Sequence, residues 1–371
     1  MKYNLMLGGH LAPLLLAAGV FSPVLALALE FSTAEAPSSQ SSLSPAPPQV
    51  PVNLGTFDII INAGSGLSSN LPALAAFNRA ALQWEAYFSD PITVNITANL
   101  GALGTGIIGS TSSVILQGGY DEIRDQVVAD ALDEADDLVA TLLPTAAQFA
   151  ATLKPGSSLS GNLFATKANL KAMGFTGLDT DFGPNDATLT FSNTFAFDYD
   201  NSDGVGPGLL DFETVASHEI GHALGFISAV DAADAGVTSI SPYVLDLFRF
   251  RNGAASDPST LAEFTNNARD LVPGQPGIFD DLNHEWLMST GLNAGDGRQA
   301  SHWKADELTG NLIGIMDPTL ATGVFYGVSF ADLRALDLIG YDIIPEASPV
   351  VLCAIAGAFF LTRRNRCLAV S

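Results

Sequence analysis

The chain has 371 residues, 47% of them hydrophobic, which is enough for one large or two ordinary domains with a sizeable core. Its net charge of -24 argues against nucleic acid as a partner, because binding phosphates needs Lys and Arg. The only cysteines, Cys353 and Cys367, lie near the C-terminus, so we expect no disulfide in the body of the protein.

The first segment, residues 1–28, has the pattern of a secretory signal peptide. Lys2 is followed by a mostly apolar stretch from Leu11 to Leu27, and Ala26-Leu27-Ala28 is typical of a cleavage site. A transmembrane anchor is the alternative, but the apolar stretch is short and a polar segment follows it. Residues 29–53 are rich in Ser, Pro and Ala, which predicts a linker or a short pro-segment.

The folded body is expected to span residues 54–343 and to open with a strand, a helix and a strand. Residues 57–62 predict a buried strand, and residues 92–97 alternate apolar and polar side chains as a half-buried strand does. Between them, residues 70–88 predict a helix, with apolar side chains recurring at helical spacing. A helix that joins two strands favours parallel pairing of those strands.

Further along, residues 113–117 predict a short strand and residues 121–143 a second helix that ends at Pro144. Residues 187–193 predict a later strand, which residues 195–197 extend. The order of elements indicates an α/β (α+β) protein with a mixed, twisted sheet.

An acidic loop follows this strand and has a partial resemblance to a calcium-binding loop. Asp198, Asp200 and Asp203 are the candidate ligands for Ca²⁺. The spacing departs from the EF-hand pattern, because Gly204 comes one place late and Leu209 occupies the position of the usual Glu. The alternative is a solvated acidic turn.

The strongest chemical signal is the sequence His218-Glu219-Ile220-Gly221-His222, a His-Glu-x-x-His pattern. At about 3.6 residues per turn, His218 and His222 lie on one face of a helix, so both imidazoles can bind one zinc ion. Glu219 lies about 100° away around the helix, where it can take a proton from water that zinc has made acidic.

A five-residue match also arises by chance, in helices where the His is a satisfied core residue and the Glu is solvated. Here the flanking residues Val215, Ala223, Leu224 and Phe226 are apolar, which predicts a buried helix. Two histidines and a glutamate are costly in a buried helix unless they are paired or bind a metal. The context therefore favours a zinc site, and Gly225 is a suitable end for the helix.

A catalytic zinc site needs a third protein ligand. The remaining imidazoles of the body are His284 and His302, and Asp231 or Glu263 would be carboxylate alternatives. His302 precedes Met316 by 14 residues, and the family resemblance that the following residues carry favours it as the third ligand.

The rest of the C-terminal half supplies a Met316-Asp317-Pro318 turn and a final helix. Ser329 and Asp332 form a helix start, and Gly340 is expected to end the helix. The helix motif, the delayed histidine, this turn and the final helix resemble the metzincin clan of zinc metalloproteases. Within that clan they are most similar to leishmanolysin-type proteases, over residues 211–342.

The resemblance implies a metzincin-like fold in which His218, His222 and His302 bind Zn²⁺ and Glu219 is the general base. It also implies that Met316 forms the Met-turn beneath the metal. Family substrates bind beside an edge strand, which would be the 187–197 region. The chain departs from the clan's compact motif, because Ser228 stands where a third His would be, and it lacks the disulfides usual in leishmanolysins.

The last segment, residues 344–371, resembles a PEP-CTERM sorting signal of Gram-negative bacteria. Pro345-Glu346-Ala347 precedes an apolar run, Val350 to Leu361, and a basic end, Arg363 to Arg366. The apolar run has 12 residues, against ~20 for a full membrane span. The resemblance implies export, transient membrane association and removal of the tail by a sorting peptidase. A permanent C-terminal transmembrane helix is the alternative.

The sequence thus predicts an exported zinc metalloendopeptidase at the cell surface or outside a Gram-negative bacterium. Its substrate would be a protein or peptide. The rival hypothesis is a non-catalytic surface or extracellular-matrix protein with a zinc-binding fold. The presence of Glu219 favours the enzyme, because a binding protein has no chemical need for that carboxylate.

Overall fold

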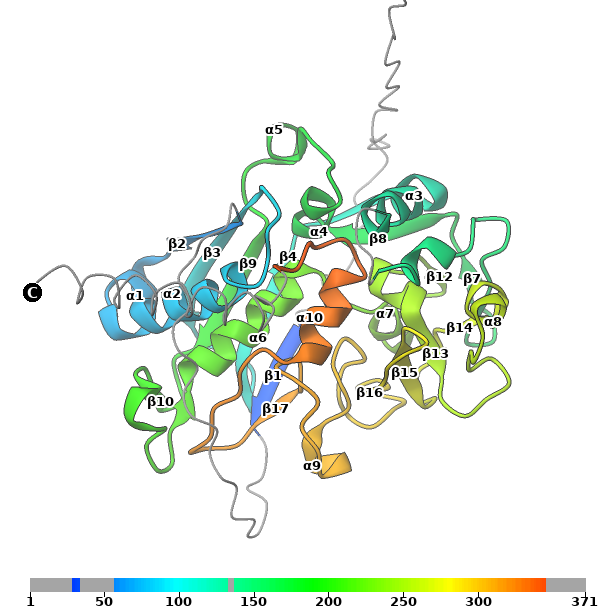
Figure 1. The fold of residues 1–371 in the computed structure, drawn as a ribbon. Coiled ribbons are helices and arrows are strands. Elements are labelled where there is room, and N and C mark those ends of the chain that lie inside the picture. Colours follow the sequence, from blue (N-terminus) through cyan, green and yellow to red (C-terminus); the bar gives the residue numbers. More distant parts are fainter. Residues whose placement is uncertain (1–28, 34–56, 133–136, 345–371) are drawn as a thin grey trace, which may run out of the picture.

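The largest sheet has six strands, in the order β17-β1-β4-β9-β3-β2 (Figure 1). The computed structural model describes residues 29–33, 57–132 and 137–344. The sheet is mixed, because β4 runs antiparallel to both of its neighbours, whereas the other pairs are parallel. Its strands are β1 (Leu29–Thr33), β2 (Asp58–Ala63), β3 (Thr93–Gly101), β4 (Ile107–Ser113), β9 (Ala187–Ser192) and β17 (Thr319–Leu320). The predicted α+β class with a mixed sheet is confirmed at this level.

The predicted strand-helix-strand opening is present as β2, α2 (Leu71–Glu85) and β3, and the two strands are parallel. Asn70 caps the helix by accepting the N–H of Ala73, and the helix ends three residues before the predicted boundary. Phe77 and Trp84 are fully buried. The indole N–H of Trp84 donates to the carbonyl of Ser217 at 3.0 Å, which ties α2 to the helix that carries the His-Glu-x-x-His motif.

The expected linker over residues 29–53 is wrong for its first five residues, because residues 29–33 form β1. This strand pairs antiparallel with β4 and parallel with β17, so it lies inside the sheet. Backbone hydrogen bonds on both sides can hold such a strand whatever its composition, and a composition-based reading misses it for that reason.

Other boundaries also differ from the sequence predictions. The strand expected at 113–117 is β5 (Ile115–Gly119), and β4 was not predicted. The helix expected at 121–143 is α3 (Tyr120–Ala131), with a separate 3₁₀ turn, η1 (Ala140–Leu142). Residues 195–197 do not extend β9, because β10 (Phe197–Asp198) pairs with β11 (Leu210–Asp211) in a separate small sheet.

The 187–197 region is not an edge strand, which corrects the expectation drawn from the metzincin resemblance. β9 lies between β3 and β4 and pairs with both. Its backbone hydrogen-bonding groups are therefore used within the sheet, and an extended peptide has no free edge there.

A smaller sheet, β13-β15-β16, is antiparallel and lies in the C-terminal half of the chain. Its strands are β13 (Arg249–Arg251), β15 (Gly277–Asp280) and β16 (Glu285–Met288). Met288 forms an isolated bridge with Trp303, so this sheet positions the chain next to His302.

The remaining elements are short, apart from two helices. These two are α6 (Phe212–Leu224) and α10 (Phe330–Asp337), and Figure 1 shows both near the centre of the molecule. The short elements are α1 (Ser65–Ser68), β6 (Ala151–Thr152), β7 (Ser158–Leu159), β8 (Asn162–Thr166), α4 (Lys167–Ala172), α5 (Leu178–Phe182), η2 (Asn201–Asp203), α7 (Val230–Asp234), β12 (Ser239–Ile240), η3 (Val244–Phe248), α8 (Leu261–Asn266), β14 (Arg269–Asp270) and α9 (Asp306–Thr309).

The predicted signal peptide, residues 34–53 of the predicted linker and residues 345–371 of the predicted sorting segment lie outside the described residues. Within the described part of the chain, no helix combines the length and the apolar character needed to cross a membrane.

Candidate metal centre

Helix α6 carries the His-Glu-x-x-His motif through the middle of the protein. Asp211 caps its first turn by accepting the N–H of Thr214 at 2.8 Å. All thirteen residues of the helix are buried, as its apolar flanks predict. The helix ends at Gly225, whose φ of 128° is strained for any residue with a side chain.

The structure brings His302 to the two histidines of α6. The three Nε2 atoms lie 3.2 Å (His218 to His302), 3.1 Å (His222 to His302) and 3.1 Å (His218 to His222) apart. All three side chains are fully buried. Three imidazoles from two distant parts of the chain therefore point at one spot.

The hydrogen bonds of the rings fix their tautomers. Each Nδ1 atom faces a backbone carbonyl oxygen: His218 faces Ile315 (2.7 Å), His222 faces Phe226 (2.8 Å) and His302 faces Gln299 (3.0 Å). A carbonyl oxygen only accepts, so each Nδ1 carries the proton of a neutral ring and donates it. The Nε2 lone pairs are then the groups that converge.

Burial keeps the three rings neutral. It lowers the pKa of His218 and His222 well below the ordinary value, and the neighbouring imidazoles lower both further. Burial also lowers the pKa of His302 to about 4, against the opposing effect of the Gln299 carbonyl. Neutral imidazoles whose Nε2 atoms carry no proton are the form that binds transition metals.

The donor set fits zinc. Three Nε2 atoms at about 2.0–2.1 Å from a tetrahedral zinc would lie roughly 3.3 Å from one another. The observed separations of 3.1 to 3.2 Å are close to this value. Three lone pairs at this distance repel one another unless a cation lies between them.

Glu219 is fully buried on the same helix and is held by β4. The Thr111 hydroxyl lies 2.5 Å from Glu219 Oε2 and 2.9 Å from the Glu219 carbonyl oxygen. A Cβ atom on Gly109 would lie 2.4 Å from Glu219 Oε1, so β4 can approach α6 this closely only with Gly at that position. Thr111 and Gly109 together orient the carboxylate.

Met316 packs against the same helix from another direction. It is 1% exposed, and a Cβ atom on Gly221 would lie 2.3 Å from its sulfur. Gly221 directly precedes His222 in the motif, so the thioether lies against the helical turn that carries the candidate site. The backbone carbonyl of Met316 also accepts the N–H of Trp303 at 3.0 Å.

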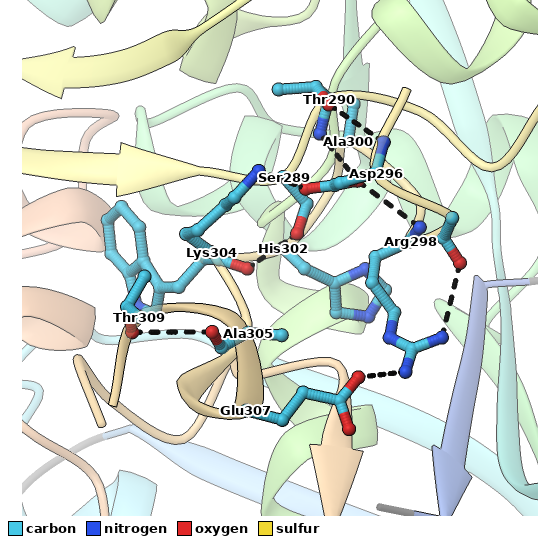
Figure 2. Close-up of polar contacts among 12 residues, drawn as sticks. Ser289, Thr290, Asp296, Arg298, Ala300, His302, Lys304, Ala305, Glu307 and Thr309 are labelled. Carbon is cyan, nitrogen blue, oxygen red and sulfur yellow. Dashed lines mark hydrogen bonds and ion pairs between the residues drawn. The ribbon is translucent and has the colours of Figure 1, made fainter. Parts of the chain in front are cut away.

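The segment that carries His302 has no regular structure and is held by side chains from elsewhere. Both oxygens of Asp231 accept backbone N–H groups, from Ala300 at 2.6 Å and from Ser301 at 3.0 Å. The His302 carbonyl accepts the N–H of Ser289 at 3.0 Å. Figure 2 shows this segment, with His302 at its centre and an ion pair between Arg298 and Glu307 beside it.

The other ligand candidates are not part of the cluster. His284 stacks on Trp286, with ring centroids 5.2 Å apart, and its Nδ1 lies 3.2 Å from Asp281 Oδ1. Asp231 is occupied by the backbone near His302. Glu263 accepts a hydrogen bond from the Ser259 hydroxyl at 2.8 Å.

Two carboxylates of the acidic loop, both candidate ligands for calcium, accept hydrogen bonds from the backbone of the loop itself. Asp198 is half-buried, and it accepts the N–H groups of Asp200 and Gly206. Asp200 is exposed and accepts the N–H of Ser202. Among the described residues, Asp198, Asp200 and Asp203 do not form a group of closely spaced metal-ligating atoms. The structure fits the alternative of an acidic turn.

The sequence reasoning missed three positioning residues, namely Gly109, Thr111 and Asp231. Thr111 and Gly109 lie in the unpredicted strand β4, within a run of small residues that carries no apolar alternation. The sequence suggests Asp231 only as an alternative zinc ligand. Its distance from Ser301 along the chain hides its role in holding the His302 segment.

Comparisons with known proteins do not identify a family. No protein-family model matches the chain. No curated protein and no solved structure matches it either.

Proposed function

We propose that this chain is a zinc-dependent endopeptidase. The observation that carries the proposal is the convergence of three neutral imidazoles, from His218, His222 and His302, with every Nδ1 proton given to a carbonyl. A structural role for three buried histidines would not require all their Nε2 lone pairs to meet. The buried carboxylate of Glu219 on the same helix adds the base that hydrolysis needs.

In the proposed reaction the chain supplies ligands, a base and a support for each. Zinc, when bound by the three histidines, would polarise the scissile carbonyl and lower the pKa of a coordinated water. Glu219 takes the proton of the attacking water and delivers it to the leaving amine. Thr111 donates a hydrogen bond to Glu219 and fixes the direction in which the carboxylate points.

The packing around the site supports a metzincin-type architecture. Met316 lies against Gly221, beneath the helix that carries two of the ligands. The final helix α10 begins at Ser329 with a capping box, and its Asp332 accepts the N–H of Ile315 at 2.7 Å. The turn that contains Met316 is thereby fixed to the helix that follows it. Ser228 donates to Asp246 at 2.6 Å and is not a ligand candidate.

The test combines metal analysis with peptidase assays on the purified protein. We expect one zinc per chain, casein cleavage that stops on chelation, and recovery when zinc is restored. Glu219→Gln should keep zinc and lose cleavage, because a neutral amide cannot act as the base. Glu263→Gln is the matched control, since it removes a half-buried carboxylate that is not part of the histidine cluster, and it should change neither property.

Two outcomes would count against the enzyme. Stoichiometric zinc with no cleavage of any peptide in an unbiased library would favour the non-catalytic surface or matrix protein. Cleavage that survives both chelation and Glu219→Gln would exclude the proposed mechanism altogether.

Export is a separate part of the proposal and rests on the two chain ends. We infer a signal peptide at residues 1–28 and a sorting tail from residue 344, removed by a sorting peptidase after transient membrane association. The mature protein would then be found at the surface or outside a Gram-negative cell. Intact-mass measurement on protein from the native cell surface should show loss of both ends. A full-length mass would contradict it.

A further inference from the structure

Three carboxylates meet at the turn end of the β15–β16 hairpin. Asp280 ends β15, Glu285 begins β16, and the two residues pair directly across the hairpin. Asp257 reaches the same place from the loop that follows β13. One oxygen from each residue lies within 4.8 Å of the other two. Like charges at this distance repel, and a cation bound among them would relieve that repulsion.

Asp280 is the buried member of the group, with 1% of its surface exposed. Its Oδ1 accepts the N–H of Leu282 at 2.6 Å, but its Oδ2 is buried and has no hydrogen-bond partner. Leaving a carboxylate oxygen buried and unpaired is costly, and native structures rarely do so without a reason. The unpaired oxygen belongs to the buried member of the group, and a cation bound by the three residues would pair with it.

The neighbouring Asp281 shows what is different about Asp280. Asp281 is also buried, but Arg334 Nε lies 2.7 Å from its Oδ2. Burial raises the pKa of Asp281 and Arg334 lowers it, and the guanidinium prevails. Burial, together with Glu285 and Asp257, raises the pKa of Asp280 to about 6.

No ion pair between described residues involves Asp257, Asp280 or Glu285. Two further carboxylates near Asp281, those of Asp137 and Asp337, also form ion pairs with Arg334. The protein therefore neutralises one group of buried acids with a side chain and leaves the adjacent group without one.

We propose that Asp257, Asp280 and Glu285 bind a calcium ion. All three offer only oxygen, which hard divalent cations prefer over the nitrogen and sulfur ligands that suit zinc. Oxygens bound to one calcium at 2.3–2.6 Å can lie up to about 5 Å apart, and the group meets this limit. Asp257 is half-buried and Glu285 exposed, so water completes the six to eight ligands that calcium takes.

The ion would join the loop after β13 to the β15–β16 hairpin. β16 ends at Met288, which bridges to Trp303, the residue next to His302. Calcium is thus expected to stiffen the sheet that supports the third histidine without touching the histidines. The site does not depend on the proposed peptidase activity.

The test is calcium titration by calorimetry on the full chain, preloaded with zinc so that the histidines are occupied. We expect one calcium per chain and a melting temperature that rises with calcium. Glu285→Gln should weaken calcium binding at least tenfold, because it removes one charged ligand from an exposed position where folding is not at risk. Asp280→Asn should do the same.

Asp200→Asn is the matched control, because it removes an exposed aspartate from the acidic turn at 198–203. It should leave the calcium affinity unchanged. Absence of calcium binding by the unaltered chain would overturn the proposal, as would binding that Glu285→Gln and Asp280→Asn both leave intact. Loss of binding in Asp200→Asn alone would assign the calcium to the acidic turn and also overturn it. Each readout is independent of hydrolysis.

Discussion

The two halves of the histidine cluster are held in different ways. His218 and His222 come from one helix, and the spacing of a single turn brings them together. His302 comes from a segment without regular structure, which is fixed by a buried carboxylate, Asp231, and by the backbone of Ser289. The helix half is therefore a local structure, whereas the loop half is a product of the whole fold.

This difference makes the loop half the more vulnerable one. If α6 loses its cap or one packing contact, His218 and His222 still lie four residues apart on one face of the helix. The position of His302 depends on hydrogen bonds between residues about 70 positions apart in the chain, such as Asp231 and Ser301. The substitutions below compare the two halves, from the largest expected effect to the smallest.

Removal of a ligand should have the largest effect. His302→Ala should reduce zinc affinity by more than the roughly 10- to 100-fold that loss of a ligand's hydrogen-bond partner costs. Peptidase activity should disappear with the metal. His284→Ala is the matched control and should keep both, because His284 packs on Trp286 outside the cluster. Metal analysis and a casein assay decide, and the opposite pattern would show that His284 is the ligand.

Loss of the support for His302 should come next. Asp231→Ala leaves the N–H groups of Ala300 and Ser301 buried without their acceptor, so the segment loses its fixed position. We expect zinc affinity to fall by about 10- to 100-fold, since the ligand remains but is poorly oriented. Competition with a zinc-binding dye measures this. An unchanged affinity together with an unchanged melting temperature would mean that the loop half is rigid without Asp231.

A substitution beside the helix half should affect catalysis and spare the metal. Thr111→Val keeps the shape of the side chain and removes the hydroxyl that donates to Glu219. The loss of one hydrogen bond to a charged group, about 1.5 kcal/mol, should lower kcat roughly tenfold. Thr111→Ser restores the hydroxyl and should recover most of the rate. If Thr111→Val lost zinc, β4 would have to support the ligands and not the base.

The smallest expected effect is on stability, from a buried carboxyl that belongs to neither half of the histidine cluster. It serves as a reference for the substitutions within the cluster. Asp90 is 2% exposed, and burial and the charge of Asp342 raise its pKa to about 8. Since the folded state favours the protonated acid, its stabilisation is complete below about pH 4 and is lost as the pH rises through 8. Asp90→Asn should therefore reduce the fall in melting temperature between pH 5 and pH 8 by several degrees.

The measurement is a series of melting curves over that pH range, with zinc affinity followed in parallel. Asp58→Asn, at an exposed position of β2, is the control and should leave the wild-type pH dependence in place. A pH dependence that Asp90→Asn does not alter would assign it to other buried acids, including those near the site.

The sequence was sufficient for the parts of the protein whose structure is local. The apolar spacing around Trp84 predicted α2, and the parallel β2–β3 pair followed from it. The helix motif and Gly225 predicted the helix and its C-terminal end, which the structure confirms for α6. Ser329 and Asp332 predicted the start of α10, which the structure confirms.

Features that depend on contacts between residues far apart in the sequence could not be predicted from local patterns. β4 carries small polar residues because Gly109 and Thr111 face Glu219, so the strand shows no apolar alternation. The acidic turn at Asp200 follows a regular spacing, but local backbone N–H groups satisfy it. The group around Asp280 has no regular spacing, because hairpin pairing and a separate loop assemble it.

Strand β1 determines how another chain could approach the site. β4 is paired on one side with β9 and on the other with β1, and β1 is itself paired with β17. Without β1, a gap one strand wide, about 10 Å between the axes of β4 and β17, would lie beside the strand that carries Thr111. An extended polypeptide that pairs with β4 on that side must therefore take the place of residues 29–33.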